Sequence, residues 1–181
     1  GAARPSIADP FLPLKISEGR IEDIRECIGC NICYAHDSLG VPIRCTQNPT
    51  MGEEWRFGWH PEKIKKKKSP KRFLVVGAGP SGLEAARVLG EQGNKVILAE
   101  ATRNLGGRVI KESNLLGLAE WRRVSDWRIT QINKLPNIEI YRESELVAND
   151  VTELNVDFVM IATGAKWAED AVGRHSDTGF E

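Results

Sequence analysis

The chain has 181 residues, and its 25 Lys plus Arg balance its 25 Asp plus Glu to a formal net charge of +0. This balance excludes the basic excess typical of proteins that bind nucleic acid or membrane surfaces, so we expect neither partner. The longest apolar run, residues 73–83, has about half the length of a membrane span and contains Gly and Pro. The N-terminus lacks the pattern of a signal peptide. We therefore expect a cytoplasmic globular protein.

The first third of the chain is predicted to lack regular structure. Residues 1–20 contain Pro5, Pro10 and Pro13 and are expected to be extended. Residues 21–62 carry all the cysteines. The run KIKKKKSPKR, residues 63–72, is typical of a solvated basic linker.

Cys27, Cys30, Cys33 and Cys45 follow the spacing C-x2-C-x2-C-x11-C. Three thiolates at three-residue steps, with Gly29 keeping the loop tight and a fourth from a later loop, favour a [4Fe–4S] cluster. Structural zinc, which normally takes two separated ligand pairs, is one alternative. Disulfides are another, although they are typical of secreted proteins. His36 lies between the third and fourth cysteines and is interpreted as a polar loop residue or a donor behind the ligands.

From residue 73 the pattern alternates between strands and helices. We expect strands at 73–79, 94–100, 137–141 and 156–165, with a short meander around Leu146 and Val147 before the last one. Helices are expected at 80–93 and 118–135, the second ended by Pro136. The first helix places Leu83, Ala86, Leu89 and Gly90 on one face. The prediction is an α/β, Rossmann-like domain with a parallel sheet.

The sequence Gly77-Ala78-Gly79-Pro80-Ser81-Gly82 matches G-x-G-x-x-G between the first strand and its helix. Gly77 permits the turn, Gly79 lets a pyrophosphate approach the backbone, and Gly82 allows close packing of helix and strand. Phosphates then lie against the helix N-terminus, beside Pro80 and Ser81. Glu100 ends the second strand and is placed to bind ribose hydroxyls, which favours FAD, ADP or NAD over NADP.

Two later motifs are typical of flavoproteins. ATRNLGGR, residues 101–108, contributes Gly107 and Arg108, and IATGA, residues 161–165, contributes Ala162, Thr163 and Gly164. IATGA alone is equally consistent with a plain strand end of small residues. Together with the Gly-rich loop, these motifs favour an ADP site of the flavoprotein type, to which Val147 is also assigned.

Three successive segments resemble the iron–sulfur flavoenzymes related to trimethylamine dehydrogenase and 2,4-dienoyl-CoA reductase. They are ECIGCNIC, CTQNPTMGEEWRFGWHPE and VVGAGPSGLEAARVLGEQGNKVILAEATRNLGGR. The resemblance covers residues 1–167. It implies that residues 1–20 are the last strand and phosphate loop of an FMN-binding TIM barrel, with FMN phosphate contacts at Ala3 and Arg4. Residues 21–62 would be the [4Fe–4S] segment, and residues 73–181 the first half of a truncated FAD- or ADP-binding domain.

The same resemblance implies that substrate chemistry lies outside this chain, so no catalytic residue is expected in it. We expect an excerpt of a longer enzyme that is a homo-oligomer, with an open sheet edge where later strands are missing. The remainder of that enzyme would be the chain's first partner.

The resemblance leaves the direction of electron flow open. GLAEWRRVSDWRITQINKL resembles the amine-dehydrogenase branch, which implies electrons passing from FMN through the cluster to an acceptor such as an electron-transferring flavoprotein. The alternative is an NAD(P)H-dependent enoate or dienoyl-CoA reductase that uses FAD, cluster and FMN. A third, non-enzymatic possibility is a zinc-stapled regulatory module that binds a nucleotide.

Overall fold

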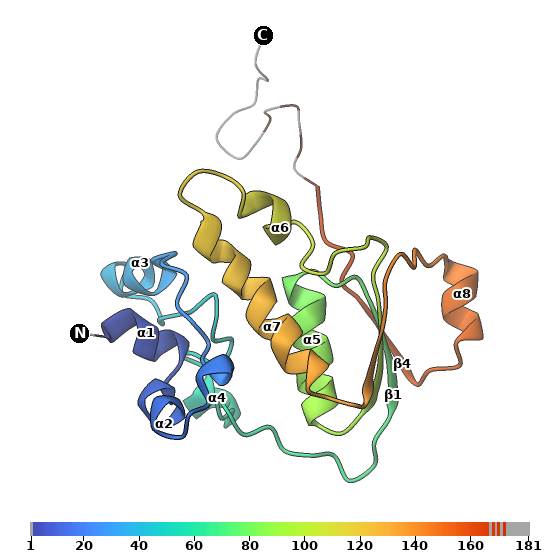
Figure 1. Ribbon diagram of the computed structural model, residues 1–181, viewed down its shortest axis with the longest axis horizontal. Helices are drawn as coiled ribbons and strands as arrows, with labels where there is room; N and C mark the ends of the chain where they lie inside the picture. Colours follow the sequence, from blue (N-terminus) through green and yellow to red (C-terminus); the bar gives the residue numbers. More distant parts are fainter. Residues whose placement is uncertain (1, 167, 169, 171, 173–181) are drawn as a thin grey trace.

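The computed structural model describes residues 2–166, 168, 170 and 172. A helical N-terminal part precedes an α/β part (Figure 1). The N-terminal part contains α1 Ala3–Ala8, α2 Leu12–Ser17, the 3-10 helix η1 Ile21–Asp23, α3 Ile32–Ser38 and α4 Glu54–Phe57. The α/β part contains β1 Arg72–Val76, α5 Pro80–Glu91, β2 Lys95–Ala99, α6 Val109–Glu112, η2 Ala119–Arg122, α7 Arg123–Asn133, β3 Ile138–Tyr141, α8 Ala148–Glu153 and β4 Phe158–Ile161.

The four strands form one sheet of order β3-β2-β1-β4, and every pair is parallel. Val75 of β1 is in register with Leu98 of β2 on one side and with Met160 of β4 on the other. The predicted parallel α/β fold is therefore confirmed. The strands are shorter than predicted, because Gly77 and the residues after Ile161 form turns at the carboxyl edge of the sheet.

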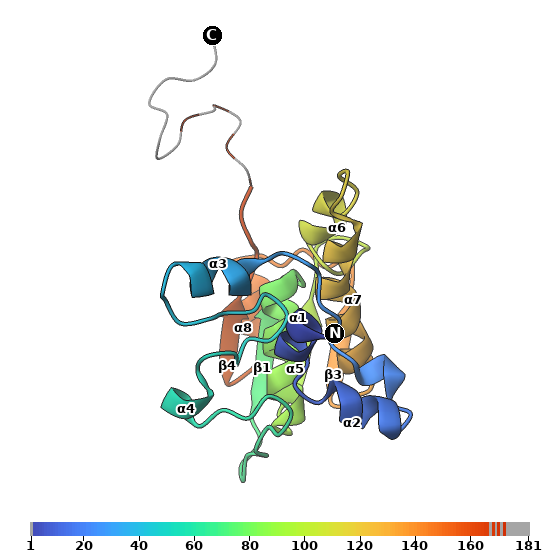
Figure 2. The same cartoon turned by 90° about the vertical axis from the view of Figure 1, so that its left-hand side faces the viewer.

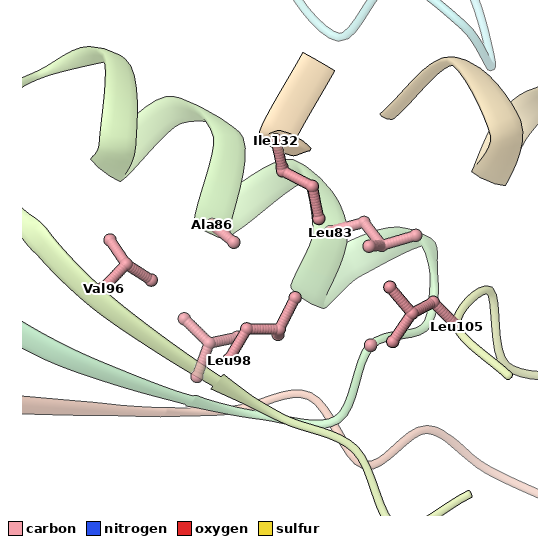
Figure 3. Close-up of a cluster of buried hydrophobic side chains, with 8 residues drawn as sticks. Leu83, Ala86, Val96, Leu98, Leu105 and Ile132 are labelled. Carbon is pink, nitrogen blue, oxygen red and sulfur yellow. The ribbon is translucent and has the colours of Figure 1, made fainter. Parts of the chain in front are cut away.

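The hydrophobic core lies between one face of the sheet and helices α5 and α7 (Figures 1 and 3). Leu83 and Ala86 of α5 contribute to it, and Gly90 of the same face is buried as well. A Cβ on Gly90 would meet Ile138 Cδ1 at 2.6 Å, so a larger residue here would require the Ile138 side chain to move. The predicted inner face of this helix is confirmed, with Leu89 partly buried at its margin.

β4 differs from the buried strand that its apolar sequence predicts. Its four side chains are between 41% and 79% exposed, and only Phe158 stacks on a neighbour, Phe73 of β1, at 5.0 Å between ring centroids. Within the described residues β4 is an edge strand, paired on one side only. The expected open edge is present, and α8 lies on the side of the sheet away from α5 and α7 (Figure 1).

The prediction of an extended N-terminal segment is wrong. Described residues 2–20 contain α1 and α2 and no strand, so the predicted last barrel strand is not observed there. Pro5 and Pro13 lie in the first turns of these helices. Helical N–H groups have no intrahelical acceptor in a first turn, and the fixed φ of proline suits a helix start, so neither proline opposes the fold.

Two further segments differ from the prediction. The meander around Val147 leads directly into α8, and the predicted helix 118–135 starts as the 3-10 helix η2 and ends at Asn133. None of the helices in the described part of the chain is long and apolar enough to cross a membrane.

The N-terminal helices are held to the following segment by a buried ion-pair network. Lys15 is 1% exposed, and its Nζ lies 2.7 Å from Asp9 Oδ2 and 3.0 Å from Glu62 Oε1. It also donates to the carbonyl of Asp23 at 2.9 Å. A buried ammonium with three acceptors is well satisfied, so this network links α2, which lies near α7 (Figure 2), to the segments at Asp23 and Glu62.

Candidate cluster and nucleotide site

Two of the cysteines, Cys27 and Cys30, lie in the tight loop that leads into α3, and a third lies at the start of that helix. Gly29 has φ +69°, a left-handed conformation that favours glycine, and its N–H donates to Cys27 Sγ at 3.4 Å. Cys33 lies in the first turn of α3. Cys30 Sγ lies 3.1 Å from Oγ1 of Thr46, the residue that follows Cys45. The loop that carries the fourth cysteine is therefore adjacent to the first three.

All four cysteines are free thiols of intermediate exposure. Burial raises the pKa of the Cys45 thiol, while hydrogen bonds from the backbone amides of Asn48 and Gln47 act to lower it. Backbone amides of this kind donate hydrogen bonds to the thiolate ligands of iron–sulfur clusters. A cysteine has to be deprotonated when it binds a metal, so metal binding at Cys45 would release a proton.

The four cysteine thiols form the candidate donor set. Within the described residues, no group of three or more Cys, His, Asp or Glu side chains is placed to hold a metal ion. Thiolates are the ligands that iron–sulfur clusters use, and zinc takes them as well. The predicted cluster therefore stays a prediction at this point.

The structure gives His36 a different role from metal ligation. Its ring Nδ1 lies 3.1 Å from the carbonyl oxygen of Pro42 and donates to it in the tautomer that this acceptor requires. This bond closes the loop after α3, which agrees with the interpretation of His36 as a polar loop residue.

Helix α7 contacts the chain near the first cysteine and near the fourth, and the sequence pattern did not predict either contact. Arg123 Nη1 donates to the carbonyl of Cys27 at 3.3 Å. Arg128 Nη1 donates to Gln47 Oε1 at 3.0 Å, and its Nη2 donates to the Gln47 carbonyl at 3.2 Å. Two arginines five positions apart on a helix give no hint in the sequence of which loop they contact.

The predicted nucleotide motifs meet at the carboxyl edge of the sheet. Gly77 has φ +98°, and a Cβ there would lie 2.4 Å from the carbonyl oxygen of Ala162. A Cβ on Gly82 would lie 1.9 Å from the Gly77 carbonyl oxygen, and one on Gly107 would lie 2.9 Å from Gly79 Cα. The three motifs are thus packed together through backbone contacts that exclude side chains.

The N-terminus of α5 fits a phosphate group. Gly79 is its N-cap residue, and no side chain caps the helix there. A Cβ on Gly79 would have no atom within 4 Å, so open space lies beside this N-cap residue. Pro80 and Ser81 form the first helical positions at this opening. Uncapped amides at a helix N-terminus favour an anion.

Glu100 anchors the Gly-rich loop in addition to its predicted role. Its side chain is 8% exposed, Oε2 accepts from the Ala78 N–H at 2.8 Å, and Oε1 accepts from Thr102 N and Oγ1 at 2.9 Å. A carboxylate has about four acceptor sites, so capacity remains for a ribose hydroxyl.

The other predicted nucleotide residues lie around the same edge. Arg108 is exposed, pairs with Glu112 at 2.7 Å and donates to the carbonyl of Ala165 at 3.4 Å. Thr163 and Gly164 are exposed directly after β4. Val147, 62% exposed, starts α8 beyond β3. The role of Val147 in a nucleotide site stays a prediction.

A cavity of about 350 Å³ joins the cysteine loop to the helix N-terminus. It is lined by Cys30 and Thr46 on one side and by Ser81 on the other, with Trp121 and Arg128 from the η2–α7 region. The candidate cluster and nucleotide sites are therefore neighbours.

Ala3 and Arg4 lie in α1, and both are exposed. The Arg4 guanidinium donates to the side-chain oxygen of Asn31, between Cys30 and Cys33. Arg4 and Cys33 also line a second cavity of about 510 Å³. The predicted FMN-phosphate arginine thus lies directly beside the cysteine loop.

Comparison with known proteins identifies the family. Residues 49–179 match the family described as pyridine nucleotide-disulphide oxidoreductase. This match covers more than half of the chain. The chain belongs to this oxidoreductase family.

Individual relatives narrow the comparison. Dimethylamine dehydrogenase of Hyphomicrobium sp. (strain x) is 50% identical over 97% of this chain and 25% of its own length. The structure of histamine dehydrogenase from Rhizobium sp. 4-9 matches with a TM-score of 0.93 and 56% identity, over 97% of this chain and 26% of that one. A 2-naphthoyl-CoA reductase structure matches with a TM-score of 0.84 and 36% identity, over 92% and 25%.

The chain thus spans about a quarter of the length of the relatives it matches. The resemblance to the trimethylamine dehydrogenase family of iron–sulfur flavoenzymes is confirmed by dimethylamine dehydrogenase and histamine dehydrogenase.

Proposed function

We propose that this chain is the electron-transfer portion of an iron–sulfur flavoprotein amine dehydrogenase. The adjacency of the two candidate sites carries the electron-transfer part of the proposal, which both directions of electron flow share: one cavity is lined by Cys30 of the cysteine loop and Ser81 of the nucleotide-binding turn. In this proposal residues 1–20 belong to the end of an FMN-binding barrel, 21–62 to the cluster segment, 63–72 to a linker, and 73–181 to the FAD or ADP domain.

The four thiolates of Cys27, Cys30, Cys33 and Cys45 would hold a [4Fe–4S] cluster. When bound, such a cluster accepts and releases single electrons. The chain's own groups would tune it: the Gly29 amide donates toward Cys27, and the Thr46 hydroxyl lies against Cys30. Hydrogen bonds of this kind stabilise negative charge on the sulfurs.

The Gly-rich loop would hold the pyrophosphate of ADP or FAD. The open space at Gly79 and the uncapped amides of α5 favour the phosphates, and Glu100 is left to accept a ribose hydroxyl. In the proposed dehydrogenase ADP would have a structural role. Ala3 and Arg4 would contact the phosphate of FMN held mainly by the barrel, and Arg4 beside Asn31 would bring that phosphate near the cluster.

The alternative is an NAD(P)H-dependent reductase in which FAD passes electrons to the cluster and then to FMN. The cavity between Ser81 and Cys30 favours it, since a flavin there would lie between nucleotide and cluster. The sequence identity is higher to the two amine dehydrogenases, 50% and 56%, than to the reductase, 36%, which favours the amine dehydrogenase. We propose a methylated or related amine as the substrate, an external acceptor such as an electron-transferring flavoprotein, and a cytoplasmic homo-oligomer.

Anaerobic reduction of the intact protein distinguishes the two directions. We expect dimethylamine, trimethylamine or histamine to bleach the visible absorbance, and NADH and NADPH to leave it unchanged. Nucleotide released by denaturation is expected to be ADP. Bleaching by NADH or NADPH alone, with FAD released, would replace the proposal by the reductase alternative.

A further inference from the structure

A buried set of charges joins the cysteine segment to α5 and α7. Arg25, Arg87 and Arg128 are 2%, 5% and 3% exposed. All three guanidiniums lie over the ring of Trp127, at 4.3, 5.4 and 5.9 Å from its centroid. The side chain at the centre of this set is Glu84, whose Oε1 lies 2.5 Å from Arg87 and whose Oε2 lies 2.8 Å from Arg128.

Glu84 is the most buried of the carboxylates that face these guanidiniums. Glu91 pairs with Arg87 at 2.7 Å, and Glu62 acts electrostatically on Arg25, but their side chains are 28% and 27% exposed and therefore better screened than Glu84. Arg25 has two nitrogens, Nε and Nη1, without a hydrogen-bond partner among the described residues. Burial alone would raise the pKa of Glu84, but the three guanidiniums hold it below the usual range, so Glu84 is ionised. Buried charges are screened little by solvent, so they act strongly on a neighbouring site.

Arg128 is the member of this set that reaches the cysteine segment. Its two bonds to Gln47 place the guanidinium two residues from Cys45, and it lines the same cavity as Cys30. A further bond to the Val124 carbonyl at 2.8 Å fixes it on α7. Burial lowers the pKa of Arg128, and the neighbouring Glu84 carboxylate acts to raise it.

We propose that Arg128 is a positioning residue that sets the reduction potential of the cluster through its buried charge. The inference rests on the proposed function, because it needs a cluster at Cys27, Cys30, Cys33 and Cys45. One-electron reduction adds one negative charge to the site with no bond made or broken. A buried cation beside Cys45 stabilises that added charge, so it raises the potential, whereas Glu84 opposes it.

The test compares Arg128→Met, which removes the charge at similar volume, with Arg128→Lys, which keeps it. Both variants lose the paired bonds to Gln47, so a merely structural role would move both alike. The midpoint potential is measured on the intact holoprotein by dithionite titration followed by EPR, after iron and sulfide analysis. We expect Arg128→Met to lower the ratio of reduced to oxidised cluster at a fixed potential at least tenfold, which corresponds to about 59 mV for one electron. Arg128→Lys should change the same ratio less than threefold.

Arg123→Met is the matched control on the same helix. Arg123 donates to the Cys27 carbonyl, but its side chain is 37% exposed, so solvent screens its charge and a smaller shift is expected. Equal potentials in wild type and Arg128→Met, or equal shifts in the Met and Lys variants, would overturn the inference.

Glu84→Gln provides a test of opposite sign if Arg128→Met assembles no cluster. Loss of the buried negative charge should raise the reduced-to-oxidised ratio at least tenfold, and no rise would overturn the inference. A wild-type protein without iron and sulfide would overturn the proposed function together with this inference. An intact cluster with an unshifted potential in the variants would overturn this inference alone.

Discussion

Replacing Gly82 with alanine would place a Cβ 1.9 Å from the carbonyl oxygen of Gly77 and 3.0 Å from its carbonyl carbon. Gly77 cannot move away freely, because its own Cα faces the Ala162 carbonyl across the turn. Alanine gains about 1 kcal/mol of helix propensity over glycine, but a clash this close with buried backbone costs about 3 kcal/mol, the upper end of the range for overpacking.

We expect a net loss of about 2 kcal/mol for Gly82→Ala, because both clashing groups are main chain and neither has a rotamer to relax into. At about 2–4 °C per kcal/mol for a chain of this size, the melting temperature should fall by about 4–8 °C. The assay is a thermal melt of the nucleotide-free protein followed by circular dichroism.

Gly79→Ala is the matched control, because it makes the same substitution three residues earlier. Gly79 has φ −69° and ψ 178°, which alanine adopts without strain, and its Cβ would meet no atom within 4 Å. The melting temperature should change by less than about 2 °C, since the weaker N-cap and the stiffer unfolded chain offset each other. Affinity for ADP, measured by calorimetry, should fall at least tenfold because the methyl group occupies the phosphate approach. An unchanged melt for Gly82→Ala, or unchanged ADP affinity for Gly79→Ala, would refute this reasoning.

Three further predictions test the ligands, the core and the surface charges. Cys45→Ser should lose the iron found in the wild type, whereas His36→Ala should keep it, as measured by iron analysis after anaerobic purification. Leu83→Ala should cost about 2–5 kcal/mol in urea unfolding, while Leu116→Ala, at a fully exposed position, should stay within about 0.5 kcal/mol. Burial alone would raise the pKa of Asp23, but hydrogen bonds from side chains at the end of α7 hold it below 3.8. Asp23 therefore stabilises the fold above about pH 4 and loses this effect as the pH falls, so Asp23→Asn should cost about 0.5 kcal/mol at pH 7 and nothing near pH 2.

The parts of the fold that the sequence predicted are those set by local pattern. The β1–α5–β2 unit follows from an apolar run, three spaced glycines and a helical face at Leu83 and Ala86, all within 30 residues. In the structure, close backbone approaches bring Gly107 and Ala162 to the Gly-rich turn. The conformation of α1 and α2 was missed, because a proline excludes the helix interior but suits its first turn.

Contacts between segments that are distant in the chain could not be predicted from the sequence pattern. Arg128 and Gln47 are 81 positions apart, and the spacing of polar residues on α7 shows only that one face is charged. The cysteine spacing predicted the candidate ligands, but the contact of Thr46 with Cys30 depends on how the loop after α3 folds back. Helix α8 is a single short element whose start depends on the Asp150 carboxylate accepting from the Val147 N–H at 2.8 Å.

The iron, acid-labile sulfide and zinc content of the anaerobically purified protein tests the central claim most directly. A cluster held by Cys27, Cys30, Cys33 and Cys45 predicts about four irons and four sulfides per chain, without zinc. Zinc in place of iron, with no sulfide, would contradict electron transfer through this segment and leave only the nucleotide-binding fold.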